Sequence, residues 1–190
     1  PVGGGGILLH QTQAGVAAMN GPQAVRDLLE RAVALHRAGR LDEAAALYRQ
    51  AHALAPDDFN ALHLLGLIEL QLGHDEEALR WFDAALRIDT RSAPAHGNRG
   101  NALMRLQRPD EAVESYDRAL ALQPEWVEGW YNRGLLLATL GRLHAALVSY
   151  ERALGLNPGL AQAWNSRGLV LYSLGRNREA LENYDRAVAI

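Results

Sequence analysis

Residues 127–160 decide the fold, and they read VEGWYNRGLLLATLGRLHAALVSYERALGLNPGL. Small residues, one aromatic ring and one proline stand at fixed points in this stretch: Gly134, Gly141, Ala146, Tyr150, Ala153 and Pro158. Small residues let two helix backbones approach within about 8–10 Å, and the ring fills the space beneath the next pair of helices. Gly141 suits the end of a first helix, where the capping residue often takes the left-handed backbone conformation. Pro158 suits the end of a second helix. The stretch therefore predicts a helical hairpin with helices near 127–140 and 143–156.

The same pattern recurs every 34 residues without a gap, from about residue 25 to the last residue. The aromatic place, for example, holds Tyr48, Phe82, Tyr116, Tyr150 and Tyr184. Two positions depart from the pattern, because Gln107 replaces the second glycine and Thr90 replaces the closing proline. We expect five repeats, at 25–58, 59–92, 93–126, 127–160 and 161–190. Their paired helices are expected near 22–38 and 42–54, 59–72 and 75–88, 93–106 and 109–122, 127–140 and 143–156, and 161–174 and 177–190.

At these residues the sequence resembles the tetratricopeptide repeat (TPR) family. The resemblance implies an all-α fold, a right-handed superhelix of helix-turn-helix repeats (a TPR solenoid), in which the first helices line a concave groove. Members of this family mostly bind peptides, extended segments or helices. The resemblance therefore implies a non-enzymatic protein–protein interaction module.

Residues 1–21 lack the repeat signature, and we expect a flexible lead-in or a short docking helix before an array at 22–190. The fifth repeat stops inside its second helix, which leaves two interpretations open. The chain is a fragment of a longer protein, or a second copy covers the open repeat end or binds the N-terminal segment, giving a homo-oligomer. A third hypothesis for the function of the chain is purely structural self-assembly through open repeat ends.

The composition excludes several function classes. The formal charge is −3 and every basic residue is an arginine, so there is no electrostatic footprint for nucleic acid and no catalytic or phosphate-loop lysine. Without cysteine there is no thiolate nucleophile or disulfide, which fits a reducing, cytoplasmic location. No apolar run is long enough to span a membrane. The histidines and serines form no metal or catalytic motif, so we expect no cofactor, no metal and no enzyme activity.

The family resemblance places the groove at the second, fifth, sixth, ninth, twelfth and thirteenth places of each first helix. We call these the groove positions. The predicted peptide-binding residues at these positions are Asn98, Asn132, Asn101, Tyr131, Tyr172, Met104, Arg105, Leu67, Leu135 and Asn165. Apolar side chains with a few amides suit an amphipathic or extended peptide. Leu64, Leu67 and Leu135 have an alternative role, packing between neighbouring first helices.

Asn98 and Asn132 occupy the same place in consecutive repeats, so we expect their amides about 10 Å apart in the groove. An amide can pair with a ligand main chain of any sequence. This row is similar to the asparagine ladder of O-linked N-acetylglucosamine transferases. It implies an alternative function, the N-terminal substrate-recognition array of a larger glycosyltransferase-like enzyme. Plain solvent-facing asparagines remain the other interpretation.

Arg99, Arg133 and Arg167 recur one repeat apart, and so do acidic residues just after each aromatic ring. We interpret the two rows as a structural ladder, in which each guanidinium pairs with a carboxylate of an adjacent second helix. The alternative is a phosphate-binding stripe. Glu69 stands where an apolar core residue is expected, and we expect it to pair with a nearby arginine.

Overall fold

The computed structural model describes residues 21–190, and the proposed lead-in, apart from Gly21, lies outside the described residues. Every secondary-structure element of this part is an α-helix. The helices are α2 (Pro22–Arg37), α3 (Leu41–Leu54), α4 (Phe59–Leu72), α5 (Asp75–Ile88), α6 (Ala93–Arg105), α7 (Pro109–Leu122), α8 (Val127–Thr139), α9 (Leu143–Leu156), α10 (Ala161–Ser173) and α11 (Asn177–Ala189). Each predicted boundary lies within one residue of the observed one. The all-α class and the five hairpins are confirmed.

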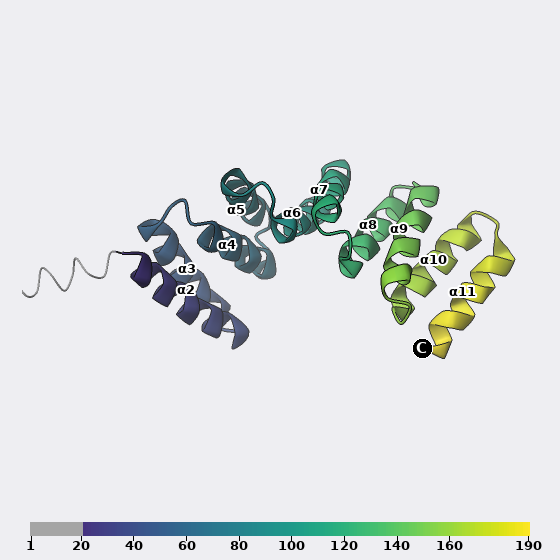
Figure 1. The fold of residues 1–190 in the computed structure, drawn as a ribbon, viewed down its shortest axis with the longest axis horizontal. Helices are drawn as coiled ribbons and strands as arrows, with labels where there is room; N and C mark the ends of the chain where they lie inside the picture. Colours follow the sequence, from purple (N-terminus) through teal and green to yellow (C-terminus); the bar gives the residue numbers. More distant parts are fainter. Residues whose placement is uncertain (1–20) are drawn as a thin grey trace, which may run out of the picture. The chain divides into compact units, whose positions relative to one another are not determined.

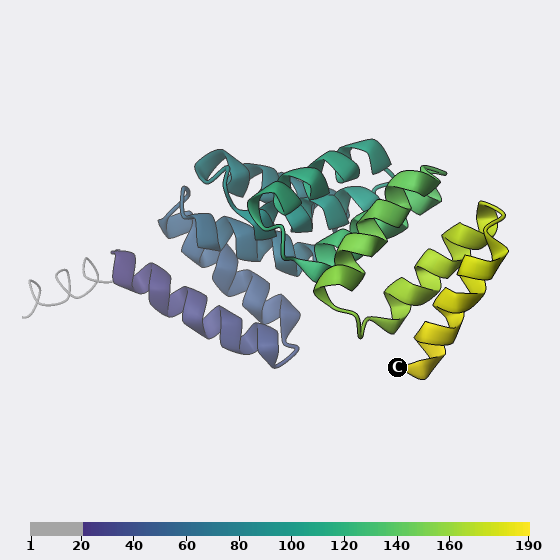
Figure 2. The same ribbon diagram turned by 45° about the vertical axis from the view of Figure 1, so that its right-hand side comes forward.

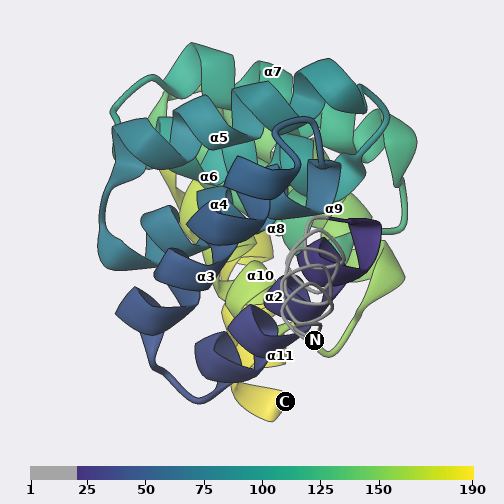
Figure 3. The same cartoon turned by 90° about the vertical axis from the view of Figure 1, so that its left-hand side faces the viewer.

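The chain divides into two compact units, residues 1–90 and 91–190. Unit 1 contains α2–α5 and unit 2 contains α6–α11 (Figure 1). Within each unit the two helices of every repeat pack against each other, as the α10–α11 pair in Figure 2 and the α2–α3 pair in Figure 3 illustrate. Successive hairpins also touch through α3 and α4 in unit 1, and through α7 and α8 and α9 and α10 in unit 2. The single array at 22–190 stays a prediction.

The turn inside each hairpin depends on one residue whose backbone is in the left-handed region, with positive φ. Gly39, Gly73, Gly141 and Gly175 all have φ between 70° and 86°. Gln107 takes the same place in the third repeat with φ 57°. A side chain in this region costs about 1–2 kcal/mol, so the repeat geometry holds Gln107 there against its own preference.

The core is built from the aromatic place and the alanines on either side of it. Tyr48 and Phe82 in unit 1, and Tyr116 and Tyr150 in unit 2, are buried. Tyr184 in α11 is only half-buried, because no further helix packs over it in the described residues. Tyr48 packs against buried residues of α4, as predicted for a ring that fills the space beneath the next hairpin.

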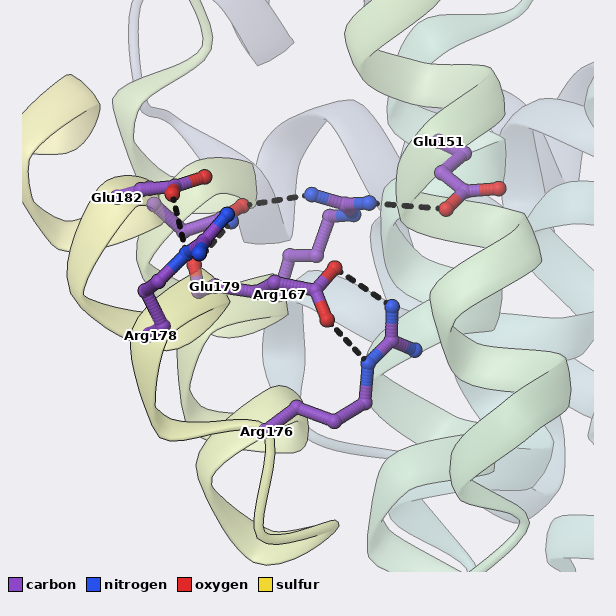
Figure 4. A network of polar contacts seen from close by, with 7 residues as sticks. Glu151, Arg167, Arg176, Arg178, Glu179 and Glu182 are labelled. Carbon is purple, nitrogen blue, oxygen red and sulfur yellow. Dashed lines mark hydrogen bonds and ion pairs between the residues drawn. The ribbon is translucent and has the colours of Figure 1, made fainter.

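In unit 2 the arginine row forms the predicted ladder. Arg133 on α8 donates from Nε to Asp117 Oδ1 on α7 at 2.6 Å. Arg167 on α10 donates from Nη2 to Glu151 Oε1 on α9 at 2.9 Å (Figure 4). Both guanidinium groups are mostly buried, so each rung ties a first helix to the second helix of the preceding repeat.

Each arginine of the ladder also bonds the second helix of its own repeat. Through Nη1, Arg99 donates a hydrogen bond to Ser115 Oγ, and Arg133 donates one to Ser149 Oγ. Arg167 Nη1 donates to Asn183 Oδ1, and the three distances are 2.7–3.0 Å. All three arginines therefore hold their own hairpins together, and Arg133 and Arg167 also join theirs to the hairpin before. These contacts support the structural interpretation over a phosphate stripe, because the guanidinium donors are used inside the fold.

In unit 1 a different ion pair joins a second helix to the next first helix, and its acid, Glu69, stands at the place of Leu137 and Leu171 and not at the arginine place. Arg49 stands on α3 at the place that holds an acid in the later repeats, and it donates to Glu69 Oε1 on α4 at 2.5 Å. Glu69 is fully buried, and its second oxygen lies 2.7 Å from His74 Nδ1. The predicted pairing of Glu69 with an arginine is confirmed.

Candidate functional site

Unit 1 has a cavity of about 470 Å³ on the face of its first helices. Counted from residues 25 and 59, where the first two repeats begin, every residue that lines it occupies a groove position of α2 or α4: Arg26, Leu29, Glu30, Val33, Arg37, Asn60, His63 and Leu64. The volume lies in the range of ordinary ligand pockets. The packing of the first two hairpins thus places groove positions of α2 and α4 around the same cavity.

The lining combines an apolar wall with charged groups. Leu29, Val33 and Leu64 pack against the buried core of unit 1, which fixes their positions. Arg26 and Arg37 are exposed at either end of α2. The predicted residue Leu67 is half-buried on α4 and is not part of the cavity lining. This hollow suits a segment that has both apolar and charged side chains.

His63 is a titratable side chain in the lining of the cavity. Its ring lies 5.6 Å from that of Phe59 and 5.8 Å from that of Phe82, centroid to centroid. Burial lowers the pKa of His63 below its ordinary value near 6.5, because the charged imidazolium loses hydration there. The fold therefore favours neutral His63.

The depressed pKa of His63 predicts a pH-dependent stability. As the pH falls through about 6.5 the unfolded chain takes up a proton before the folded chain does, so stability is lost between the unfolded and folded pKa values. We expect the wild type to lose more unfolding free energy between pH 7 and pH 5 than His63→Asn, measured by urea denaturation. Equal losses in the two proteins would contradict the burial of a neutral imidazole.

The remaining predicted site residues all lie in unit 2. Four come from α6, three from α8 and two from α10: Asn98, Asn101, Met104 and Arg105; Tyr131, Asn132 and Leu135; and Asn165 and Tyr172. Met104, Arg105, Asn165 and Tyr172 are exposed, and the others are half-buried. Their accessible side chains fit the chemistry of a binding face, whereas their role in binding stays a prediction.

Two of these predicted residues are anchored by the core rings. Tyr116 donates a hydrogen bond from its hydroxyl to Asn101 Oδ1, so the Asn101 amide group keeps its NH₂ as the donor for other partners. Tyr131 packs near Tyr150, with 6.1 Å between ring centroids. Burial raises the pKa of Tyr116, and it raises that of Tyr150 to about 12. Both hydroxyls therefore stay protonated at neutral pH.

The sequence prediction missed Trp126. It lies in the turn before α8, outside the groove positions, and a Cβ atom added at Gly97 would overlap its ring. A Cβ atom at Gly129 on α8 would overlap the same ring. The sequence signal that could have predicted this packing is the pair of glycines, because a residue without a side chain leaves room for an indole ring. Gly97 is a groove position, so the Trp126 ring covers one groove position of α6.

One group of potential metal ligands is present in the described part of unit 1. Donor atoms of Glu69, His74 and Glu77 lie within 4.8 Å of one another. Both oxygens of Glu69 already have partners, one in Arg49 and one in His74. The Arg49 charge beside the carboxylate opposes a second cation, so we assign this cluster to the stability of unit 1.

The helices pack in pairs through small residues, and the first helices of unit 1 line a cavity. This arrangement defines a helical repeat scaffold. The chain belongs to the tetratricopeptide repeat family, since family models described as tetratricopeptide repeat match residues 24–91, 98–161 and 140–190. No curated protein sequence matches the chain. In residues 21–190, no helix has the length and apolar character that crossing a membrane requires.

Solved structures of similar fold include MamA and YrrB. A crystal structure of MamA has 25% sequence identity and a TM-score of 0.80, covering 83% of this chain and 92% of MamA. YrrB, described as a TPR protein with an unusual peptide-binding site, has 28% identity and a TM-score of 0.74, covering 85% of this chain and 84% of YrrB. MamA from Desulfovibrio magneticus RS-1 has 18% identity, a TM-score of 0.82 and coverage of 87% and 93%.

Proposed function

We propose that this chain is an interaction scaffold that binds a peptide or helix of a partner protein at the groove positions of its first helices. The observation that carries this proposal is the cavity of about 470 Å³ whose lining consists of groove positions of α2 and α4 alone. Family membership supports it, and so does the peptide-binding site named for the similar structure YrrB.

The lining suggests the kind of ligand. Apolar ligand side chains would pack on Val33 and Leu64, and ligand charges would pair with Glu30 and Arg37 at the rim. In unit 2 the amides of Asn98 and Asn132 would bond the ligand main chain, and Tyr172 would supply an exposed ring. The alternative function, substrate recognition for a larger glycosyltransferase-like enzyme, rests on the two asparagines and stays a prediction.

A selected peptide tests the proposal. A phage-displayed library of random peptides is enriched on the wild-type chain, and the Kd of the winning peptide is measured by fluorescence anisotropy. We expect Glu30→Arg/Arg37→Glu, or Asn98→Ala/Asn132→Ala, to raise that Kd about tenfold, since each pair removes polar contacts proposed for the ligand.

The matched control is Arg80→Glu, an exposed charge reversal on the second helix α5. It is expected to leave the Kd within about twofold, because surface changes outside an interface have small effects. Circular dichroism must show unchanged helicity in every variant. Enrichment of no peptide, or equal affinity of groove variants and control, would contradict the proposed function.

A further inference from the structure

The cavity of unit 1 carries its formal charges on one wall. Arg26, Glu30 and Arg37 all belong to α2. The opposite wall, on α4, adds side chains that are neutral at pH 7: Asn60, His63 and Leu64. The charges that a ligand meets in this cavity therefore come from α2 alone.

These three charged side chains are exposed. Among the described residues, none of them forms an ion pair or a side-chain hydrogen bond, whereas Arg49 of the same unit is paired with Glu69. Arg26 and Glu30 stand four residues apart on one helix, but an exposed pair at that spacing contributes little to helix stability. A ligand can therefore pair with all three charges without breaking an ion pair of the fold.

The three charges lie in a single stripe along α2. An α-helix rises about 1.5 Å and turns about 100° per residue, so Glu30 stands about 6 Å along the axis from Arg26. Arg37 stands about 16 Å from Arg26, and the three side chains point within about 40° of one another around the axis. The stripe thus presents a positive, a negative and a positive charge in a fixed order.

A helical ligand can match this stripe, and an extended ligand cannot. Residues of a second helix that are separated by four and seven positions also share one face and span about 16 Å, in either direction of the chain. An extended chain advances about 3.3 Å per residue, so its matching residues would come about two and five positions after the first. Because side chains of an extended chain alternate between two faces, the odd spacing turns one of them away from α2.

The apolar part of the lining lies beside the charged stripe. Leu29 and Val33 stand on one side of it on α2, and Leu64 faces the same cavity from α4. All three pack against the buried core of unit 1, which fixes the floor on which a ligand would rest. A stripe of charge next to an apolar floor is the surface that an amphipathic helix recognises.

We propose that the partner segment at unit 1 is an amphipathic α-helix that lies along α2 and carries an acidic, a basic and an acidic side chain opposite Arg26, Glu30 and Arg37. Its neighbouring apolar side chains enter the cavity. This inference rests on the proposed function, and it selects a helix of defined charge order from the two kinds of ligand proposed there.

Designed helical peptides test this charge order. The matching peptides carry Glu, Lys and Glu, spaced by four and seven residues or by seven and four, beside a row of leucines. The inverted peptides carry Lys, Glu and Lys at the same places, with compensating charges on the far face that keep the net charge equal. By fluorescence anisotropy, the wild type should bind the tighter matching peptide about tenfold more strongly than its inverted form. A proline at the centre of the matching peptide should also weaken binding about tenfold, because it breaks the helix.

The protein variants make the test reciprocal. Arg26→Glu/Glu30→Arg/Arg37→Glu should exchange the preference, so that the inverted peptide binds about tenfold more tightly than the matching one. Arg31→Glu is the matched control, because Arg31 is an exposed residue of α2 outside the cavity lining and its reversal changes the net charge by the same amount. This control should keep the preference of the wild type. Circular dichroism checks that both variants retain their helices.

Equal affinity of the wild type for the two charge orders, or a preference that survives the triple reversal, overturns the proposal. Undiminished binding of the proline peptide also overturns it and points to an extended ligand. The outcome for the proposed function is separate. If a library-selected peptide depends on the groove positions while the designed helices show no preference, the scaffold function stands and the helical ligand alone is rejected. If neither kind of peptide binds, both are rejected.

Discussion

Gly134→Leu is expected to lower the free energy of unfolding of unit 2 by about 3 kcal/mol, because it overpacks a closed core. A Cβ atom at Gly134 would lie 2.6 Å from Tyr150 Cε1, and the Tyr150 ring is itself buried. The ring has no room to withdraw, so α8 and α9 must separate. Urea denaturation followed by circular dichroism measures the loss.

Gly100→Ala is the control for this close approach. The equivalent Cβ atom there would lie 3.3 Å from the Tyr116 ring, which a small shift accommodates. Alanine also favours a helix over glycine by about 1 kcal/mol, so this variant should be near-neutral. A Gly134→Leu protein as stable as Gly100→Ala would show that the glycine is not needed for hairpin packing.

Arg49→Met is expected to destabilise unit 1 by about 2–3 kcal/mol, because it leaves the fully buried carboxylate of Glu69 without its cationic partner. His74 still contacts the second oxygen and moderates the loss. Thermal or urea unfolding of the single variant measures the effect.

The double variant Arg49→Met/Glu69→Leu separates a buried-charge effect from lost packing. It should recover to within about 1 kcal/mol of the wild type, since an apolar pair can replace a buried ion pair. Arg80→Met, on an exposed part of α5, should change stability by less than about 0.5 kcal/mol. If the double variant is no better than Arg49→Met, the buried charge is not the cause.

The helices and ladder of this chain were accessible from sequence because their determinants repeat. A fixed spacing of small residues, rings and prolines placed each helix boundary within one residue. The pairing of Arg133 with Asp117 and of Arg167 with Glu151 followed from two rows that recur together.

Features that break the repeat were harder to predict. An arginine partner was expected for Glu69, but its identity as Arg49 was not predicted, because neither residue belongs to a pair of rows that recur together. Trp126 enters the groove side from a turn, through space left by Gly97.

The character of the groove was predicted only in part. The sequence of repeats two to five predicted an apolar, amide-lined wall. The cavity in unit 1 is instead formed mostly by α2, which adds the charged residues Arg26, Glu30 and Arg37. The expected distance between the Asn98 and Asn132 amides, and their part in binding, stay predictions.

Photo-crosslinking of the selected peptide tests the central claim most directly. A peptide that carries a benzophenone group is bound, irradiated and mapped by mass spectrometry. We predict adducts on first helices at groove positions such as Leu64, Met104 and Tyr172. Adducts confined to second helices, for example at exposed Val148, would contradict binding at the first-helix face.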